Sequence, residues 1–68
     1  MAKNKAFLKL LKDKGYNYSS LSQKIGVSDM AVRHWINGRN RPSMISIMYM
    51  AKLFNMSIES VYSLFKNI

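Results

Sequence analysis

YSSLSQKIGVSDMAVRHWIN, from Tyr18 to Asn37, is the stretch that decides the fold of this chain. It predicts two short helices, at residues 18–25 and 29–37, joined by a tight turn at Gly26, since glycine tolerates the left-handed conformation that such turns need. Ser28 is a preferred N-cap residue for the second helix. Apolar residues recur at spacings that bury one face of each helix. They are Leu21, Ile25, Val27, Val32 and Trp35.

Turn and capping residues divide the rest of the chain into three further helices. A helix at residues 3–14 ends at Gly15, and a helix at residues 44–54 follows Pro42 and the N-cap Ser43. The last helix, at residues 58–66, is capped by Ser57. No stretch is typical of a strand. The prediction is therefore one all-α domain, residues 1–68, built from five short helices around a single core.

Periodicity also assigns the faces of these outer helices. In the first, Phe7, Leu10 and Leu11 share a face, and Ile58, Val61, Tyr62 and Phe65 form the apolar face of the last. For residues 44–54, spacing places five residues inward and Met50 at the flank. The five are Met44, Ile47, Met48, Ala51 and Phe54. The four methionines between residues 44 and 56 could form an adaptable binding surface, but we interpret them as core residues.

The chain has eleven lysines and arginines but only three acids, and the resulting net charge of +8 indicates an anionic partner. Such a field attracts nucleic acid or an anionic membrane surface. The chain has no cysteine and a single histidine, so we expect no metal and no cofactor. Acid, base and nucleophile do not converge in the sequence, which argues against an enzyme. Without a secretory signal or a membrane-spanning stretch, we expect a cytoplasmic protein.

The charge and the paired helices together indicate binding to double-stranded DNA. A helix that reads the major groove must be held rigidly at one angle by a second helix and a tight turn. The buried frame of residues 18–37 provides this support. The other faces of the second helix carry Asp29, Met30, Arg33, His34 and Asn37.

Residues 18–37 resemble the helix-turn-helix of the phage Cro and repressor family, also called XRE-like. The resemblance extends over residues 6–65. It includes Gly15-Tyr16-Asn17, Trp35-Ile36-Asn37-Gly38 with Arg39, Arg41, Pro42 and Ser43, and Asn55-Met56-Ser57-Ile58. It implies a lambda-repressor-like DNA-binding domain from a phage or mobile element. The implied function is that of a Cro-like repressor, bound as a dimer to a pseudo-palindromic operator and occluding a promoter.

Four positions depart from the family pattern. Ser22 stands where alanine is usual, and its small hydroxyl is expected to be tolerated. Leu11 and Ile36 stand where members often have an arginine and a glutamate that form a salt bridge, so we expect these two aliphatic side chains to touch. Tyr18 stands where glutamine commonly donates to a phosphate, a role that its hydroxyl can also fill.

The candidate DNA contacts fall into two groups. The base-reading candidates are Ser28, Asp29, Met30, Arg33 and His34. Arg33 can pair bidentately with guanine or contact a phosphate, and Met30 can lie against a thymine methyl group. Asp29 can accept from cytosine or stabilise the helix N-terminus, and we favour the second role. The phosphate-contact candidates are Asn17, Tyr18, Asn37, Arg39 and Arg41.

The apolar side chains after Pro42 exceed what one small core can bury. Ile45, Tyr49 and Leu53 form a second stripe, to which the last helix adds Tyr62, Leu64, Phe65 and Ile68. We expect an isologous homodimer whose interface includes Leu53, Ile58, Tyr62 and Phe65.

Two other functions compete with DNA binding. A protein-interaction module of the same fold, antitoxin-like or an anti-repressor, would not need arginines clustered around the second helix of the pair. A basic amphipathic membrane binder would carry its lysines on one long helix, whereas Gly15, Gly26, Gly38 and Pro42 divide this chain. We therefore expect no membrane partner.

Overall fold

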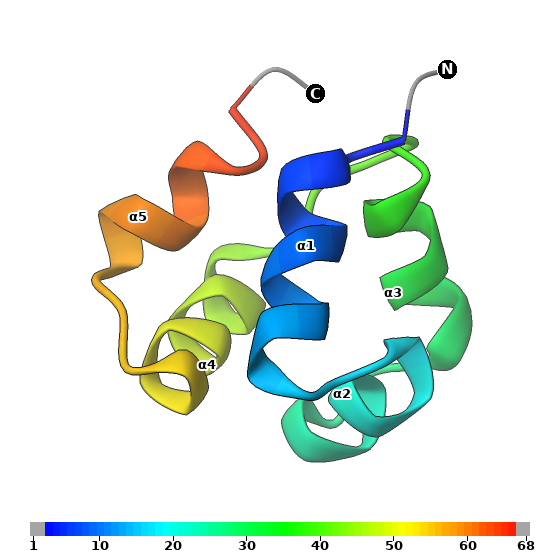
Figure 1. Ribbon diagram of the computed structural model, residues 1–68, viewed down its shortest axis with the longest axis horizontal. Helices are drawn as coiled ribbons and strands as arrows, with labels where there is room; N and C mark the ends of the chain where they lie inside the picture. Colours follow the sequence, from blue (N-terminus) through cyan, green and yellow to red (C-terminus); the bar gives the residue numbers. More distant parts are fainter. Residues whose placement is uncertain (1–2, 67–68) are drawn as a thin grey trace.

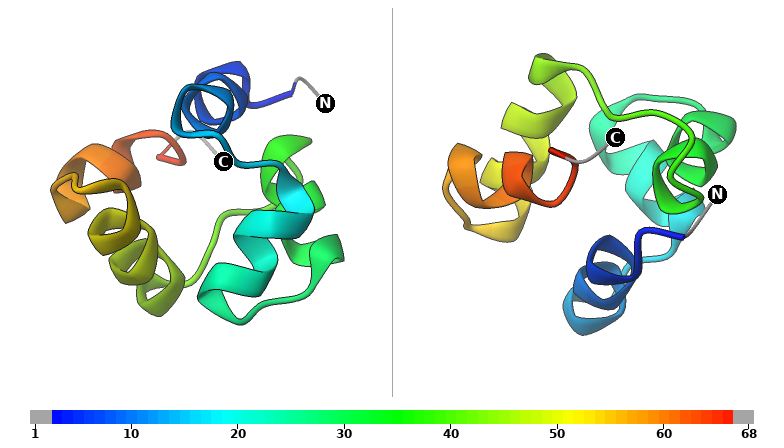
Figure 2. Two further views of the ribbon diagram at one scale, coloured as in Figure 1. Left: turned by 60° about the horizontal axis from the view of Figure 1, so that its bottom comes forward. Right: turned by 90° about the horizontal axis from the view of Figure 1, so that it is seen from above.

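The computed structural model describes residues 3–66, and within this range the chain forms five α-helices and no strand, which confirms the all-α class. The helices are α1 (Lys5–Lys14), α2 (Tyr18–Ile25), α3 (Asp29–Ile36), α4 (Met44–Phe54) and α5 (Ile58–Ser63). Helices α2 and α3 lie on one side of α1, and α4 and α5 lie on the other (Figures 1 and 2). No helix in residues 3–66 is long and apolar enough to cross a membrane.

Each helix begins at a polar side chain that accepts a hydrogen bond from the backbone N–H three residues later. These caps are Asn4, Asn17, Ser28, Ser43 and Ser57. Such caps satisfy N–H groups that have no partner within the helix. They explain the match of α2 and α4 to the predicted ranges.

Three helix ends differ from the prediction by a few residues. Helix α1 begins two residues later than expected, because Asn4 is its cap. Helix α3 ends at Ile36, and Asn37 is its C-cap. Helix α5 stops at Ser63 instead of residue 66, because the N–H groups of Leu64 and Phe65 bond to carbonyls three residues back, at 3.1 and 3.0 Å.

One apolar core joins all five helices. Its buried residues are Phe7, Leu11, Leu21, Val32, Trp35, Ile47, Met50, Ala51, Phe54, Val61 and Phe65. Phe7 links the two sides of the fold, because its ring centroid lies 6.5 Å from that of Trp35 and 4.9 Å from that of Phe65. The predicted frame of α2 and α3 is confirmed: Leu21, Val32 and Trp35 are buried, and Ile25 and Val27 pack against the core.

The face that α4 presents to the core is the predicted one in part, because Ile47, Ala51 and Phe54 are buried as expected. Met50, expected at the flank, is fully buried, whereas Met44 and Met48 are 52% and 51% exposed. The interpretation of the methionines as core residues is therefore wrong for these two. Apolar residues occur nearly all around α4, so spacing alone did not distinguish the buried face.

Asn4 connects the start of α1 to the end of α3 and to the residue that follows α5. Its backbone N–H donates to the carbonyl of Ile36 at 2.6 Å, and its Nδ2 donates to the carbonyl of Leu64 at 2.8 Å. Leu11 is buried and Ile36 packs against the same core. Helices α1 and α3 are in contact, but a direct contact between Leu11 and Ile36 stays a prediction.

Replacing Gly26 tests the conformational demand of the turn. Gly26 has φ +75°, and a Cβ there would meet no atom within 4 Å, so the cost of a side chain is backbone strain alone. We expect Gly26→Ala to lower the free energy of unfolding by about 1–2 kcal/mol and Gly26→Asn by less. Denaturant titration followed by the fluorescence of buried Trp35 measures this; equal losses for both variants would contradict the explanation.

Two variants of Asn4 separate its two side-chain roles. Asn4→Ala loses the α1 cap and the bond to Leu64, so we expect a loss of about 2 kcal/mol of unfolding free energy. Asn4→Ser retains a capping oxygen but cannot span to the Leu64 carbonyl, so about half of that loss is expected. If Asn4→Ser matched the wild-type protein in the same titration, the bond to Leu64 would contribute nothing to stability.

Candidate nucleic-acid interface

The turn between α2 and α3 is short, and two of its backbone N–H groups donate hydrogen bonds to the same carbonyl. The N–H groups of Gly26 and Val27 donate to the carbonyl of Ser22 at 2.9 and 3.0 Å. Ser28 then starts α3, and its Oγ accepts from the N–H of Ala31 at 3.1 Å. The left-handed backbone conformation of Gly26 lets the chain change direction between the two helices within these few residues.

Ser22 links the two helices through its side chain. The side chain is nearly fully buried, its Oγ lies 2.8 Å from the carbonyl of Ser19, and it donates to the carboxylate of Asp29. A hydroxyl that was expected only to be tolerated thus fixes the first turn of α3 against α2. The contact occupies Asp29 within the protein, which agrees with a structural role; base reading by Asp29 stays a prediction.

The base-reading candidates lie together on α3 and its cap. Ser28, Asp29, Met30 and Arg33 are exposed, and His34 is half-buried. Met30 is 55% exposed, so this face carries a large apolar side chain among its polar ones. The core therefore holds α3 by Val32 and Trp35 and leaves a mixed polar and apolar face in solvent.

Arg33 and Tyr18, which were assigned separate roles, contact each other across α2 and α3. Arg33 Nη2 donates to Tyr18 Oη at 2.6 Å, and Arg33 Cζ lies 4.4 Å from the centroid of the Tyr18 ring. Tyr18 is half-buried and packs against the core. No regular spacing relates residues 18 and 33, since they lie on different helices, so periodicity could not have found the pair.

The phosphate-contact candidates lie at the two ends of the segment formed by α2, the turn and α3, residues 18–36, which we call the α2–α3 unit. Asn17 caps α2 with its side-chain oxygen, so a phosphate contact would use its amide nitrogen. At the other end, exposed Asn37 caps α3, and Arg39 follows it with its backbone N–H bonded to the carbonyl of His34 at 2.9 Å. Arg41 turns toward α5, where its Nη1 lies 3.4 Å from Tyr62 Oη.

Acids neutralise little of the positive charge. Within residues 3–66 the only ion pair joins Lys9 and Asp13 at 3.4 Å, and both side chains are exposed. In the same range, no group of three or more potential metal-ligating residues gathers. The exposed guanidinium groups are therefore free to attract an anionic partner.

The expected dimer residues are only partly at the surface. Ile58 and Tyr62 are 44% and 37% exposed, and Leu53 packs against the core. Phe65 is fully buried against Phe7, so its assignment to an interface is wrong. Phe65 lies four residues after the buried Val61, so both side chains are on the side of the chain that meets the core. Ile68 lies outside the described residues.

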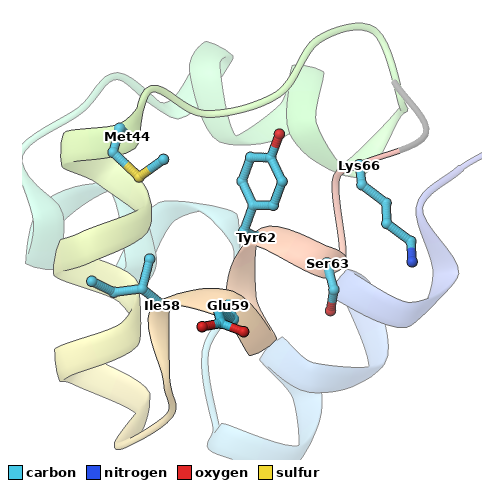
Figure 3. Close-up of a pocket in the computed structure, with 6 residues that line it drawn as sticks. All are labelled: Met44, Ile58, Glu59, Tyr62, Ser63 and Lys66. Atoms are coloured by element: carbon cyan, nitrogen blue, oxygen red, sulfur yellow. The ribbon is translucent and has the colours of Figure 1, made fainter.

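A shallow hollow of about 450 Å³ adjoins Ile58 and Tyr62. Figure 3 shows Met44 on α4 facing the side chains of α5 across it. The other lining residues are Glu59, Ser63 and Lys66. Met44 was missed as a surface residue because its spacing suited the core.

A family model described as Helix-turn-helix matches residues 8–61, from within α1 to within α5. Comparisons with curated proteins and with solved structures found no match. The matched range includes the whole α2–α3 unit, and it agrees with the exposed α3 face and the excess of positive charge. The chain therefore belongs to the XRE-type helix-turn-helix family and is a DNA-binding domain.

Proposed function

We propose that this protein is a sequence-specific transcriptional regulator that inserts α3 into the major groove of an operator. The observation that carries the proposal is the construction of α3. The buried side of α3 packs rigidly against α1 and α2, and Met30 and Arg33 are exposed on its other side. A rigid helix with a free polar and apolar face can read base edges.

The two ends of the α2–α3 unit supply contacts to the DNA backbone in this proposal. Asn17 and Tyr18 begin α2, and Asn37, Arg39 and Arg41 follow α3. Contacts on both sides of the groove fix the register of a reading helix without themselves reading sequence. The arginines also provide most of the expected salt dependence, because each neutralised phosphate releases counterions.

We further propose a homodimer that binds a pseudo-palindromic operator and represses by occluding a promoter in the cytoplasm. Ile58 and Tyr62 are apolar and partly exposed, and Met44 extends their surface across the hollow. A two-fold contact there, flanked by Leu53, would pair two copies of α3. Half-sites one helical turn apart, about 34 Å, would then suit the dimer.

One observation favours a protein-interaction module as the second candidate function. Ile45 and Tyr49 on α4 are 66% and 55% exposed, and Met48 lies beside them. This apolar stripe belongs to neither the α3 face nor the hollow. A partner protein could cover it without any contact to DNA.

Selection from a random pool of duplex DNA tests the proposed function. We expect enrichment of a motif with two-fold symmetry, because the dimer presents two equivalent reading helices. Failure to enrich any sequence at low salt would contradict sequence-specific binding and favour the protein-interaction module.

Two arginine variants separate base reading from phosphate binding. We expect Arg33→Ala to weaken the free energy of binding to the selected operator by about 1–3 kcal/mol and to relax the base preference at one base pair. Arg39→Ala should weaken binding to all sequences alike and reduce the salt slope by about one unit. Fluorescence anisotropy across operator variants and salt concentrations measures both effects; unchanged operator affinity in Arg33→Ala would show that α3 is misassigned.

A charge at the hollow tests the dimer. Ile58 is the first residue of α5 and is partly exposed, so Ile58→Glu places an acid where the helix dipole favours it and leaves the core intact. We expect self-association to weaken by about tenfold or more. Met30→Glu, the same kind of change at an exposed apolar residue on α3, is the matched control and should dimerise normally in the absence of DNA. Sedimentation equilibrium distinguishes these outcomes, and a wild-type monomer at high micromolar concentration would exclude the dimer.

A further inference from the structure

The contact between Tyr18 and Arg33 carries an inference about how specificity arises. We propose that Tyr18 is a positioning residue that holds the Arg33 guanidinium in the orientation that reads a base. The inference rests on the proposed function, because it assumes that α3 enters the major groove. It adds a specificity determinant on α2, the helix otherwise expected only to support α3 and to contact phosphates.

Arg33 needs such support because it is an exposed side chain with many rotamers. A free arginine loses up to about 2 kcal/mol of rotamer entropy when it is fixed at an interface. A contact that already selects one orientation in the free protein reduces that loss on binding. Without a fixed neighbour, the same guanidinium would reach bases and phosphates with little preference.

Tyr18 can provide a fixed platform because the protein immobilises it from two sides. Its ring packs against the core. Its backbone begins α2 directly after a capping box, in which Asn17 and Ser20 bond to each other's backbone N–H groups at 2.8 and 3.0 Å. The platform therefore moves with the rigid α2–α3 unit.

The geometry of the pair leaves Arg33 competent to read a base. The Tyr18 ring lies 4.4 Å from Cζ and its oxygen accepts one N–H from Nη2. A guanidinium carries five N–H donors, so four remain, which is enough for bidentate pairing with guanine O6 and N7. The Tyr18 oxygen acts as acceptor in this contact, so its own proton can still be donated to a phosphate.

The second arginine–tyrosine pair shows that this degree of fixation is specific to Arg33. Arg41 Cζ lies 5.9 Å from the Tyr62 ring centroid, and its hydrogen bond to Tyr62 Oη is 3.4 Å long. Tyr62 lies on α5, away from the α2–α3 unit. The shorter and more direct contact is therefore the one that involves the exposed face of α3.

The test compares Tyr18→Leu and Tyr18→Phe in the presence and absence of Arg33. The measured quantity is discrimination, the affinity for the selected operator divided by that for the operator changed at the base pair that Arg33→Ala relaxes. We expect Tyr18→Leu to reduce discrimination about two- to fivefold, the range expected for loss of an exposed cation–π contact. Tyr18→Phe, which keeps the ring, should retain more of it. In the Arg33→Ala background neither change should alter discrimination.

Controls separate positioning from folding and from phosphate binding. Tyr49→Phe, at an exposed tyrosine on α4, should change nothing, and thermal unfolding checks that the Tyr18 variants remain folded. A uniform loss of affinity at all base pairs would overturn the proposal, because it would assign Tyr18 to phosphate contact alone. Equal effects with and without Arg33 would also overturn it.

A measurement without DNA distinguishes failure of this inference from failure of the proposed function. In the free protein, the Tyr18 ring should shift the side-chain NMR signals of Arg33, and Tyr18→Leu should abolish that shift. An unshifted Arg33 would overturn the positioning role even if a specific operator is found. A shifted Arg33 in a protein that binds all duplexes equally would overturn both the specificity role and the proposed function.

Discussion

The fixed angle between α2 and α3 is the constraint on which the rest of this structure depends. Leu21 on α2 and Val32 and Trp35 on α3 are buried in one core. Gly26 ends α2 in a left-handed conformation, which keeps the connection between the two helices short. The Ser22 hydroxyl adds a side-chain bond across the same junction. A chain this small has limited apolar area to bury, so Val32 and Trp35 both stabilise the fold and hold α3 in place.

Fixing α3 by its buried side determines what its other side can do. The exposed face combines the apolar Met30 with the guanidinium of Arg33, in a protein with net charge +8 and a single exposed ion pair in residues 3–66. In the proposed function, long-range attraction to a polyanion and short-range selectivity therefore have different sources. The first comes from the unpaired cations as a group, and the second depends on how accurately a few side chains are held.

Much of the fold could be predicted because its signals are local. Capping residues and glycines specified the helices to within a few residues, and the frame of residues 18–37 followed from spacing. On α4, spacing identified Ile47, Ala51 and Phe54 but not Met50, because apolar residues surround the helix. Spacing put Phe65 on the apolar face of the last helix, but it could not distinguish burial against Phe7 from exposure at an interface. Contacts between different helices, such as that of Tyr18 with Arg33, have no periodic signature.

The most direct test of the central claim is an NMR titration of the isotope-labelled protein with its selected duplex. If α3 is the reading element, the largest amide shifts and the protein–base contacts fall on residues 28–34, with smaller shifts at residues 17–18 and 37–41. The exposed stripe of α4, around Ile45 and Tyr49, should shift little. Shifts concentrated on α4 and α5, with residues 28–34 unchanged, would contradict the account and place the binding surface on the opposite side of α1.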